Sequence, residues 1–263
     1  FAAGSVLKYG GLQAHPLAPM RAPNLVRVLD RPTRGSVGLV TYETVRRGAI
    51  ETRAAFDTLR NKGDRFAIVD ALDENDLMSI GEACADMKLI TGGSGIAIGL
   101  PENFRRAGLL DAGIAADTLP KVAGHAAVLS GSCSRATNAQ VALMAATHPS
   151  FRIDPRALAN GDDIAQQAVD WAVPKLADGP VLIYATADPD SVRNIQAKLG
   201  VDEAGALVED AMAKIARGLV AAGVRRLIVA GGETSGAVVG ALDVPGLRIG
   251  PEIDPGVPWT ASL

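Results

Sequence analysis

A chain of 263 residues has room for one large or two ordinary domains, and we expect two. Hydrophobic residues make up 48% and aromatic residues 4%, which excludes a disordered chain and predicts a core of Ala, Val, Leu and Ile. The net charge of −3, without a stripe of basic and aromatic residues, argues against nucleic acid as a partner.

Neither a membrane partner nor a zinc site finds support in the sequence. Apolar stretches fall short of the ~18 residues that cross a bilayer, and residues 1–11 lack a signal-peptide pattern. The two cysteines, Cys84 and Cys133, lie far apart and do not have the spacing of zinc ligands. We therefore expect a cytoplasmic protein with no membrane partner and no cluster of metal-ligating residues.

Helices and strands alternate along the first part of the chain. Residues 1–23 show no clear period and are predicted to form a loop. Apolar spacing predicts helices over residues 24–29, 49–61 and 73–87, and β-branched runs predict strands over residues 36–41, 66–69 and 88–91, the second of them buried. Such alternation is typical of crossover units around a mostly parallel sheet.

The chain becomes irregular between residues 103 and 121, with Pro101, Gly108, Gly113 and Pro120 breaking the pattern, so we place a domain boundary near residue 120. Beyond it, strands are predicted over residues 126–129, 181–186, 226–230 and 247–249, and helices over 136–146, most of 155–176, 191–199, 203–222 and from 235 onward; residues 250–258 form a Pro-rich tail. The predicted fold is α/β, with two domains (1–120 and 121–263) of mostly parallel sheets flanked by helices and a cleft between them.

Three junctions between a strand and a helix are rich in glycine or serine: residues 91–95 (TGGSG), 130–134 (SGSCS) and 231–235 (GGETS). The first N–H groups of a helix are unpaired and lie at the positive end of its dipole, so an anion can bind there. Glycine lets the backbone approach a phosphate, and hydroxyls add donors. Glu233 would repel a bare phosphate but could help to hold Mg²⁺. An ordinary tight turn is the alternative for each junction.

Other chemistries fit the junctions poorly. The sequence contains neither the GxxxxGK[ST] nor the GxGxxG phosphate motif, and GSCSR lacks the second glycine of a GxSxG nucleophile elbow. The thiol of Cys133 could be a nucleophile, but a small apolar side chain explains it as well. Of the three histidines, His125 enters a buried strand and is predicted to belong to the core. His15 precedes a proline in a loop and is the one we expect to face a ligand.

Four stretches together resemble the four-carbon acid sugar kinase family. Residues 128–140 (VLSGSCSRATNAQ) and 230–239 (AGGETSGAVV) resemble the two signature stretches of its nucleotide-binding domain. Residues 15–29 (HPLAPMRAPNLVRVL) and 91–104 (TGGSGIAIGLPENF) resemble the rest of its pattern, most closely in the 3-oxo-tetronate kinase branch. The resemblance covers essentially the whole chain, and the motifs stand in the family's order.

The resemblance implies ATP-dependent phosphorylation of the terminal (C4) hydroxyl of a four-carbon sugar acid such as 3-oxo-tetronate, threonate or erythronate, with ATP and Mg²⁺ as cofactors. The first domain would bind the sugar acid and the second the nucleotide. The implied substrate contacts are His15, Thr91, Gly92, Gly93 and Ser94, and the implied nucleotide contacts are Ser130, Ser132, Ser134, Gly231, Gly232, Glu233, Thr234, Ser235 and Gly236.

Two family motifs do not occur in these residues: an Asp-Asp-x-Thr-Gly stretch after a first strand, and a Ser-Gly-Asn-Phe-Gly-like loop near the carboxyl end. The first is where the resemblance places the catalytic carboxylate. We therefore expect that a polypeptide of these 263 residues alone binds nucleotide weakly and does not turn over substrate. A non-catalytic sugar-acid or phosphate-binding module and a phosphosugar isomerase or dehydrogenase stay as alternatives. The identity and stereochemistry of the acid are open, and so is the oligomeric state, for which a homodimer is one alternative.

Overall fold

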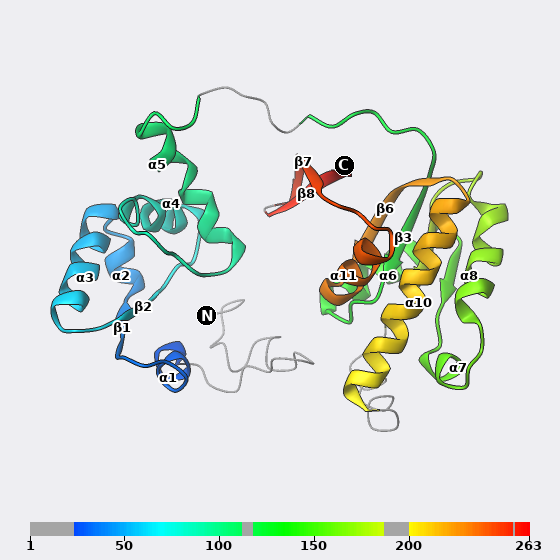
Figure 1. Ribbon diagram of the computed structural model, residues 1–263, viewed down its shortest axis with the longest axis horizontal. Coiled ribbons are helices and arrows are strands. Elements are labelled where there is room, and N and C mark those ends of the chain that lie inside the picture. The colour runs from blue at the N-terminus through cyan, green and yellow to red at the C-terminus, as the bar shows by residue number, and fades with distance from the viewer. Residues whose placement is uncertain (1–23, 112–117, 187–199, 255) are drawn as a thin grey trace. The chain divides into compact units, whose positions relative to one another are not determined.

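The computed structural model describes residues 24–111, 118–186, 200–254 and 256–263 (Figure 1). The chain divides into two compact units, residues 1–115 with 254–256 and residues 116–253 with 257–263. Each unit contains parallel strands flanked by helices, which confirms the predicted α/β class. Among the described residues, every helix is too short or too polar to cross a lipid bilayer.

The first unit contains a two-stranded parallel sheet in which Val37 lies opposite Phe66. Its core is formed by Val40, Val45, Phe56, Ile80, Ala83 and Cys84. In chain order its elements are α1 (Leu25–Asp30), β1 (Val37–Val40), α2 (Tyr42–Val45), α3 (Ala49–Asn61), β2 (Phe66–Val69), α4 (Glu74–Ala83), the 3₁₀ helix η3 (Ser94–Gly99) and α5 (Pro101–Arg106).

Local sequence signals explain where α4 begins. Asp73 precedes the helix and accepts a hydrogen bond from the Asp76 N–H at 3.1 Å, while the Asp76 carboxylate accepts one from the Asp73 N–H at 3.2 Å. This reciprocal capping box satisfies two N–H groups that would otherwise have no partner.

Three predictions for the first unit are wrong in detail. Residues 88–91 form no strand and pair with neither β1 nor β2; Leu89 there is 87% exposed, and η3 follows. Strand β2 is not buried: Phe66 is 41% exposed. Pro101 does not break the pattern but begins α5, a position that suits proline because the first helical N–H has no partner in any case.

The Cys84 thiol is the buried member of the cysteine pair, whereas Cys133 is half-buried. Burial raises the pKa of Cys84, and the nearby Arg53 cation offsets only part of this. The buried, neutral Cys84 thiol therefore contributes fully to stability below pH 9.0, which is the ordinary pKa of a thiol. This contribution is lost as the pH rises through the raised pKa of Cys84. We expect iodoacetamide to label Cys133 well before Cys84 at pH 8, as read by mass spectrometry; equal labelling rates would contradict this burial.

The second unit is built on a four-stranded sheet in the order β4-β5-β3-β6, with every described pair parallel. Its elements are β3 (His125–Ser130), α6 (Arg135–Ala145), β4 (Ser150–Arg152), α7 (Pro155–Ala159), α8 (Ile164–Ala172), the 3₁₀ helix η4 (Val173–Lys175), β5 (Val181–Tyr184), α10 (Val201–Ala221), β6 (Val224–Ala230), α11 (Gly232–Ala241), β7 (Leu247–Asp254) and β8 (Val257–Ser262). The register places Ser130 opposite both Tyr184 and Ala230, so β3, β5 and β6 end at the same edge.

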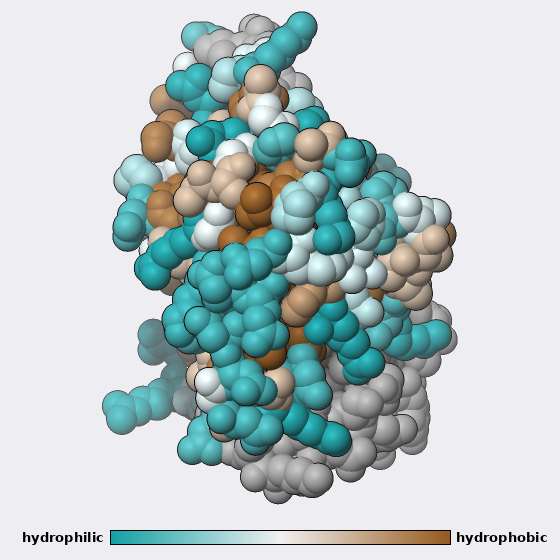
Figure 2. Space-filling view, turned by 90° about the vertical axis from the view of Figure 1, so that its right-hand side faces the viewer, coloured by the Kyte–Doolittle hydropathy of each residue, from teal (hydrophilic) through white to brown (hydrophobic). Residues whose placement is uncertain are grey.

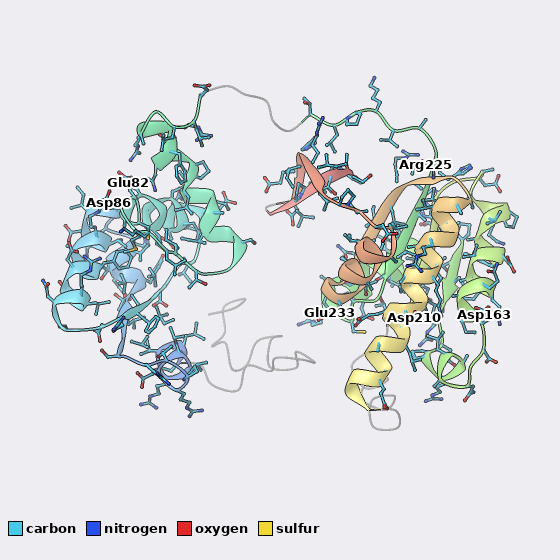
Figure 3. The ribbon with its side chains drawn as sticks, viewed as in Figure 1. Glu82, Asp86, Asp163, Asp210, Arg225 and Glu233 are labelled. Atoms are coloured by element: carbon cyan, nitrogen blue, oxygen red, sulfur yellow. The ribbon has the colours of Figure 1, made fainter. Side chains whose placement is uncertain are left out.

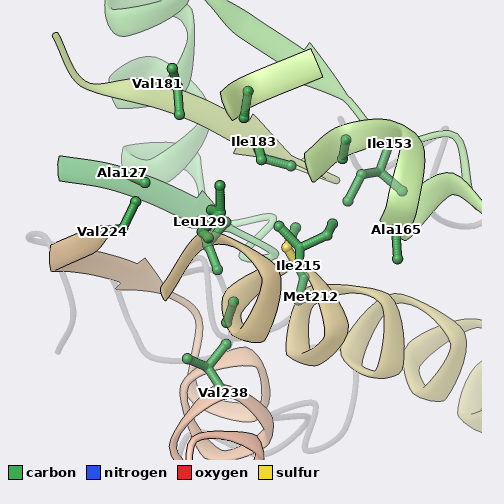
Figure 4. Packing of buried hydrophobic residues seen from close by; sticks show 14 of the residues in the cluster. Ala127, Leu129, Ile153, Ala165, Val181, Ile183, Met212, Ile215, Val224 and Val238 are labelled. Atoms are coloured by element: carbon green, nitrogen blue, oxygen red, sulfur yellow. The ribbon is translucent and has the colours of Figure 1, made fainter. Parts of the chain in front are cut away.

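The core of this unit lies between the sheet and helices α8 and α10, which run side by side (Figure 1). Leu129 of β3 and Ile183 of β5 meet Met212 and Ile215 of α10 there, all with no exposed surface (Figure 4). The face of the molecule seen in Figure 2 is mostly hydrophilic, with apolar residues near its middle and along its edges. This is the pattern of amphipathic helices covering a core of aliphatic residues, as the composition predicts.

The Pro-rich tail is the main error for the second unit. Instead of a loop, β7 and β8 pair with each other as a two-stranded sheet that contains Pro251 and Pro258. Proline is tolerated there because each strand of a two-stranded ribbon has a free edge. The short strand β4 was not predicted, and α11 begins at Gly232 rather than at residue 235. The helix predicted over 191–199 lies outside the described residues.

Candidate functional site

Two of the predicted junctions lie next to each other at the carboxyl edge of the four-stranded sheet. Strand β3 runs through Ser130 into α6, and its neighbour β6 runs through Ala230 into α11. The N–H groups of Gly131 and Ser132 both donate to the Ala230 carbonyl, at 3.0 and 3.1 Å, which ties the two loops together. Ligands of open α/β sheets bind beyond this edge, so the two loops form the candidate site.

The start of α6 is closed by its own side chains. Ser134 is the N-cap, and its hydroxyl accepts the Thr137 N–H at 3.1 Å. The Ser132 hydroxyl accepts the Ser134 N–H at 3.3 Å. Because Ala230 already takes the N–H groups of Gly131 and Ser132, most of the donors in this loop are engaged within the protein.

By contrast, no side chain caps the start of α11, and we call this helix start open. Its N-cap, Gly231, has φ +128°, a backbone conformation that strongly favours glycine, and provides no capping side chain. The N–H groups of the first three helical residues, Gly232, Glu233 and Thr234, therefore have no partner inside the helix. Nothing among the described residues lies within 4 Å of the point where a Cβ of Gly232 would be. An anion can reach these donors directly at the positive end of the helix dipole.

Thr234 sits where the two loops meet. An ideal Cβ on Gly131 would be 2.2 Å from the Thr234 Oγ1, and one on Gly231 would be 3.0 Å from it. Thr234 is 4% exposed, and its hydroxyl makes no hydrogen bond to a described residue. Since no fully buried side-chain oxygen of the described residues lacks a partner, this hydroxyl reaches the surface at the junction. It is a donor available to a ligand.

The remaining hydroxyls predicted at the site have partners within the protein. Ser130 is 1% exposed, and its Oγ lies 2.7 Å from the Oγ1 of Thr186, which follows β5. The Ser235 hydroxyl donates to the Val229 carbonyl at 3.4 Å. Thr186 was not predicted from the sequence, because only the strand order brings it next to Ser130, 56 residues away. The Ser130–Thr186 pair links the ends of two neighbouring strands and so supports the loop that follows β3.

The predicted acidic residue Glu233 is exposed at the start of α11 (Figure 3). Among the described residues no group of three or more His, Cys, Asp or Glu side chains could hold a metal ion. A single exposed carboxylate still fits Mg²⁺, because Mg²⁺ in nucleotide sites usually takes one or two carboxylates and completes its shell with phosphate oxygens and water.

The predicted substrate residues belong to the first unit. Thr91, Gly92, Gly93 and Ser94 are exposed, and Ser94 is the first residue of η3. His15 lies outside the described residues. His125, predicted to be in the core, is half-buried at the first residue of β3.

Because Ser134 caps α6, we expect Ser134→Ala to lower the free energy of unfolding by about 1 kcal/mol. Urea denaturation followed by fluorescence of Trp171, which packs against the core of this unit, measures the change. Ser134→Asp should retain stability, since Asp caps a helix as well as Ser does. An unchanged midpoint for Ser134→Ala would mean that this capping bond contributes nothing.

Two family models match separate parts of the chain. A family model described as a nucleotide-binding C-terminal domain matches residues 127–263, and one described as a sugar-binding N-terminal domain matches residues 1–100. The candidate site at residues 130–134 and 231–236 falls within the first of these matches.

Similar proteins cover the whole of this chain. A 3-oxo-tetronate kinase of Burkholderia multivorans is 56% identical over 263 residues, 100% of this chain and 61% of that protein. One of Pseudomonas fluorescens is 54% identical, over 100% of this chain and 60% of that protein. A solved structure from Salmonella typhimurium LT2, described provisionally as a tRNA synthase, is 37% identical with a TM-score of 0.74, over 97% of this chain and 60% of that one.

The chain thus spans about three fifths of the length of the curated relatives it matches. The nucleotide-binding model covers more than half of it, and the sugar-binding model covers most of the rest. The chain belongs to the four-carbon acid sugar kinase family.

Proposed function

We propose that this protein is an ATP-dependent kinase that phosphorylates the terminal (C4) hydroxyl of a four-carbon sugar acid. The first candidate substrate is 3-oxo-tetronate, because the similar proteins carry that name, and threonate and erythronate are the alternatives. The structural observation that carries the proposal is the open N-terminus of α11, which offers three N–H groups and the Thr234 hydroxyl to an anion.

In this proposal the second unit binds ATP and the first unit binds the sugar acid. The ATP phosphates lie at residues 231–236. The adjoining loop supplies the further proposed nucleotide contacts Ser130, Ser132 and Ser134. Thr91, Gly92, Gly93 and Ser94 contact the sugar acid, with His15 as a further contact. Mg²⁺, with Glu233 as its protein ligand, would neutralise phosphate charge. The protein is proposed to be cytoplasmic, and a homodimer is one possible assembly.

Phosphoryl transfer requires positioning and charge neutralisation more than covalent help from the protein. The bond between the γ-phosphorus and the β,γ-bridging oxygen breaks, a bond to the acceptor oxygen forms, and the proton of the acceptor hydroxyl leaves. The N–H groups at the start of α11 stay fixed by the helix and need no reorganisation as charge moves between the phosphate oxygens. The group that takes the proton is expected in the Asp-Asp-x-Thr-Gly motif of the family.

The test is ADP release by the intact protein with ATP, Mg²⁺ and a panel of four-carbon acids, together with thermal shifts by each ligand alone. We expect ADP release that depends on one of the acids and a thermal shift with ATP. A shift with sugar phosphate but none with ATP would instead support an isomerase, a dehydrogenase or a binding module without catalysis.

A further inference from the structure

A side chain of the neighbouring helix α10 fixes the carboxyl end of α11. Arg217 of α10 donates its Nε–H to the carbonyl of Ala241, the last residue of α11, at 2.7 Å. The last four carbonyls of a helix have no partner within it, and this one gains a cationic donor at the negative end of the helix dipole. Hydrogen bonds from a charged donor are about twice as strong as neutral ones. The bond therefore ties the end of α11 to α10.

The backbone engages two more carbonyls at this end of α11. Asp243 has a φ of 50°, a positive value that ends many helices, and its N–H donates to the Gly240 carbonyl at 3.2 Å. The Val244 N–H donates to the Val239 carbonyl at 3.3 Å. These two bonds form a Schellman motif, which leaves the carbonyl of the last helical residue for Arg217. The carboxyl end of α11 is thus fully tied, whereas no side chain caps its start.

The backbone that carries Arg217 belongs to the core of the second unit. Ile215, Ala216 and Leu219 of α10, on either side of it in sequence, have no exposed surface and pack in the core against the sheet. Val238 of α11 is 2% exposed and faces α10 (Figure 4). The hydrogen bond of Arg217 therefore relates the direction of α11 to the core of the unit.

We propose that Arg217 is a positioning residue for phosphate binding, and this inference rests on the proposed function. Through the Ala241 carbonyl it fixes the direction of α11, and with it the place of the open N–H groups at the other end of the helix. From its first to its last residue α11 rises about 14 Å, so a tilt of about 4° about its carboxyl end moves its first N–H groups by about 1 Å. Misplacement by about 1 Å can cost an enzyme about 100-fold in rate.

Calorimetric titration of the intact protein with ATP and Mg²⁺ tests this role. Arg217→Met keeps the aliphatic part of the side chain but removes the donor, and it should weaken ATP binding about tenfold. Arg217→Lys keeps a cationic donor. It should retain ATP affinity within about threefold of the unsubstituted protein, because a single bond to one carbonyl does not need the forked guanidinium.

Arg225→Met is the matched control. Arg225 is exposed, and its Nη1 donates to the carbonyls of Val220, near the end of α10, and of Val224, at 2.7 and 2.8 Å. It thus makes the same kind of bond as Arg217, but at the opposite end of β6 from Glu233 (Figure 3). We expect Arg225→Met to lower the melting temperature about as much as Arg217→Met does, while it changes ATP affinity by less than about twofold.

Three results would overturn the inference. The first is an ATP affinity of Arg217→Met equal to that of the unsubstituted protein, and the second is a loss that Arg217→Lys does not restore. The third is an equal loss of affinity in Arg225→Met, which would mark a general effect of stability. If the unsubstituted protein did not bind ATP at all, the proposed function itself would fail, and this inference would fail with it.

Discussion

Replacing Gly232 with valine is expected to weaken ATP binding by about 100-fold while the fold is retained. The side chain would stand at the first residue of α11, where the phosphates need to approach the N–H groups closely, and the loss corresponds to about 3 kcal/mol. The fold should tolerate it, because nothing among the described residues lies within 4 Å of the new Cβ and the backbone there is helical.

Calorimetric titration with ATP and Mg²⁺ measures this effect, and urea denaturation confirms that the variant is folded. Gly205→Val in α10 serves as the control, since a Cβ there makes only an ordinary contact, 3.7 Å from the Glu209 carboxylate oxygen. ATP affinity equal to that of the unsubstituted protein would show that the phosphates do not bind at the start of α11.

Gly81→Ala is expected to destabilise the first unit by about 3 kcal/mol or more. An ideal Cβ on Gly81 would be 2.4 Å from the carbonyl carbon and oxygen of Gly99, and one on Gly99 would be 2.3 Å from the Leu77 carbonyl oxygen. Helices α4 and η3 therefore meet backbone against backbone, and backbone atoms cannot move aside as the end of a flexible side chain can. Separating them would also strain the hydrogen bond from the Asn103 side-chain amide to the Gly81 carbonyl, 2.7 Å long.

Amide hydrogen exchange across α4 and η3 reports this loss, as faster exchange in the variant. Gly93→Ala is the matched control within the same unit, because nothing lies within 4 Å of its Cβ position and its φ of −63° suits alanine. It should leave exchange unchanged or slow it slightly. Normal protection in Gly81→Ala would mean that α4 and η3 can separate freely.

The elements with strong local signals were predictable from the sequence. Helix α3 has the predicted bounds, and β3 and β6 lie where β-branched and apolar runs end in glycine or serine. The predictions failed where a partner decides the structure. Residues 88–91 have strand-like composition but do not pair with β1 or β2. Strands β7 and β8 form a ribbon despite their prolines, because each supplies the other's hydrogen bonds.

For the site, the sequence predicted the glycine junctions, but it did not show at which of them the hydrogen-bond donors are already engaged within the protein. From the sequence, we expect an anion to accept hydrogen bonds from the backbone of α11 and from the hydroxyls of Ser130, Ser132 and Ser134 alike. Only the strand order shows that Ser130 is paired with Thr186 and that Ser134 caps its own helix, while the start of α11 stays open. The hydroxyl of Thr234 likewise became distinctive only through the packing of Gly131 and Gly231 around it.

The most direct test of the account follows backbone amide signals of the intact, ¹⁵N-labelled protein by NMR during titration with ATP and Mg²⁺. The amides of Gly232, Glu233 and Thr234 should show the largest shifts, because their N–H groups would donate to the phosphates, and those of Arg135 and Ala136 at the start of α6 should shift less. If the largest shifts fell on α6, or if the α11 amides did not move at saturating ATP, the phosphate site would have been placed on the wrong helix.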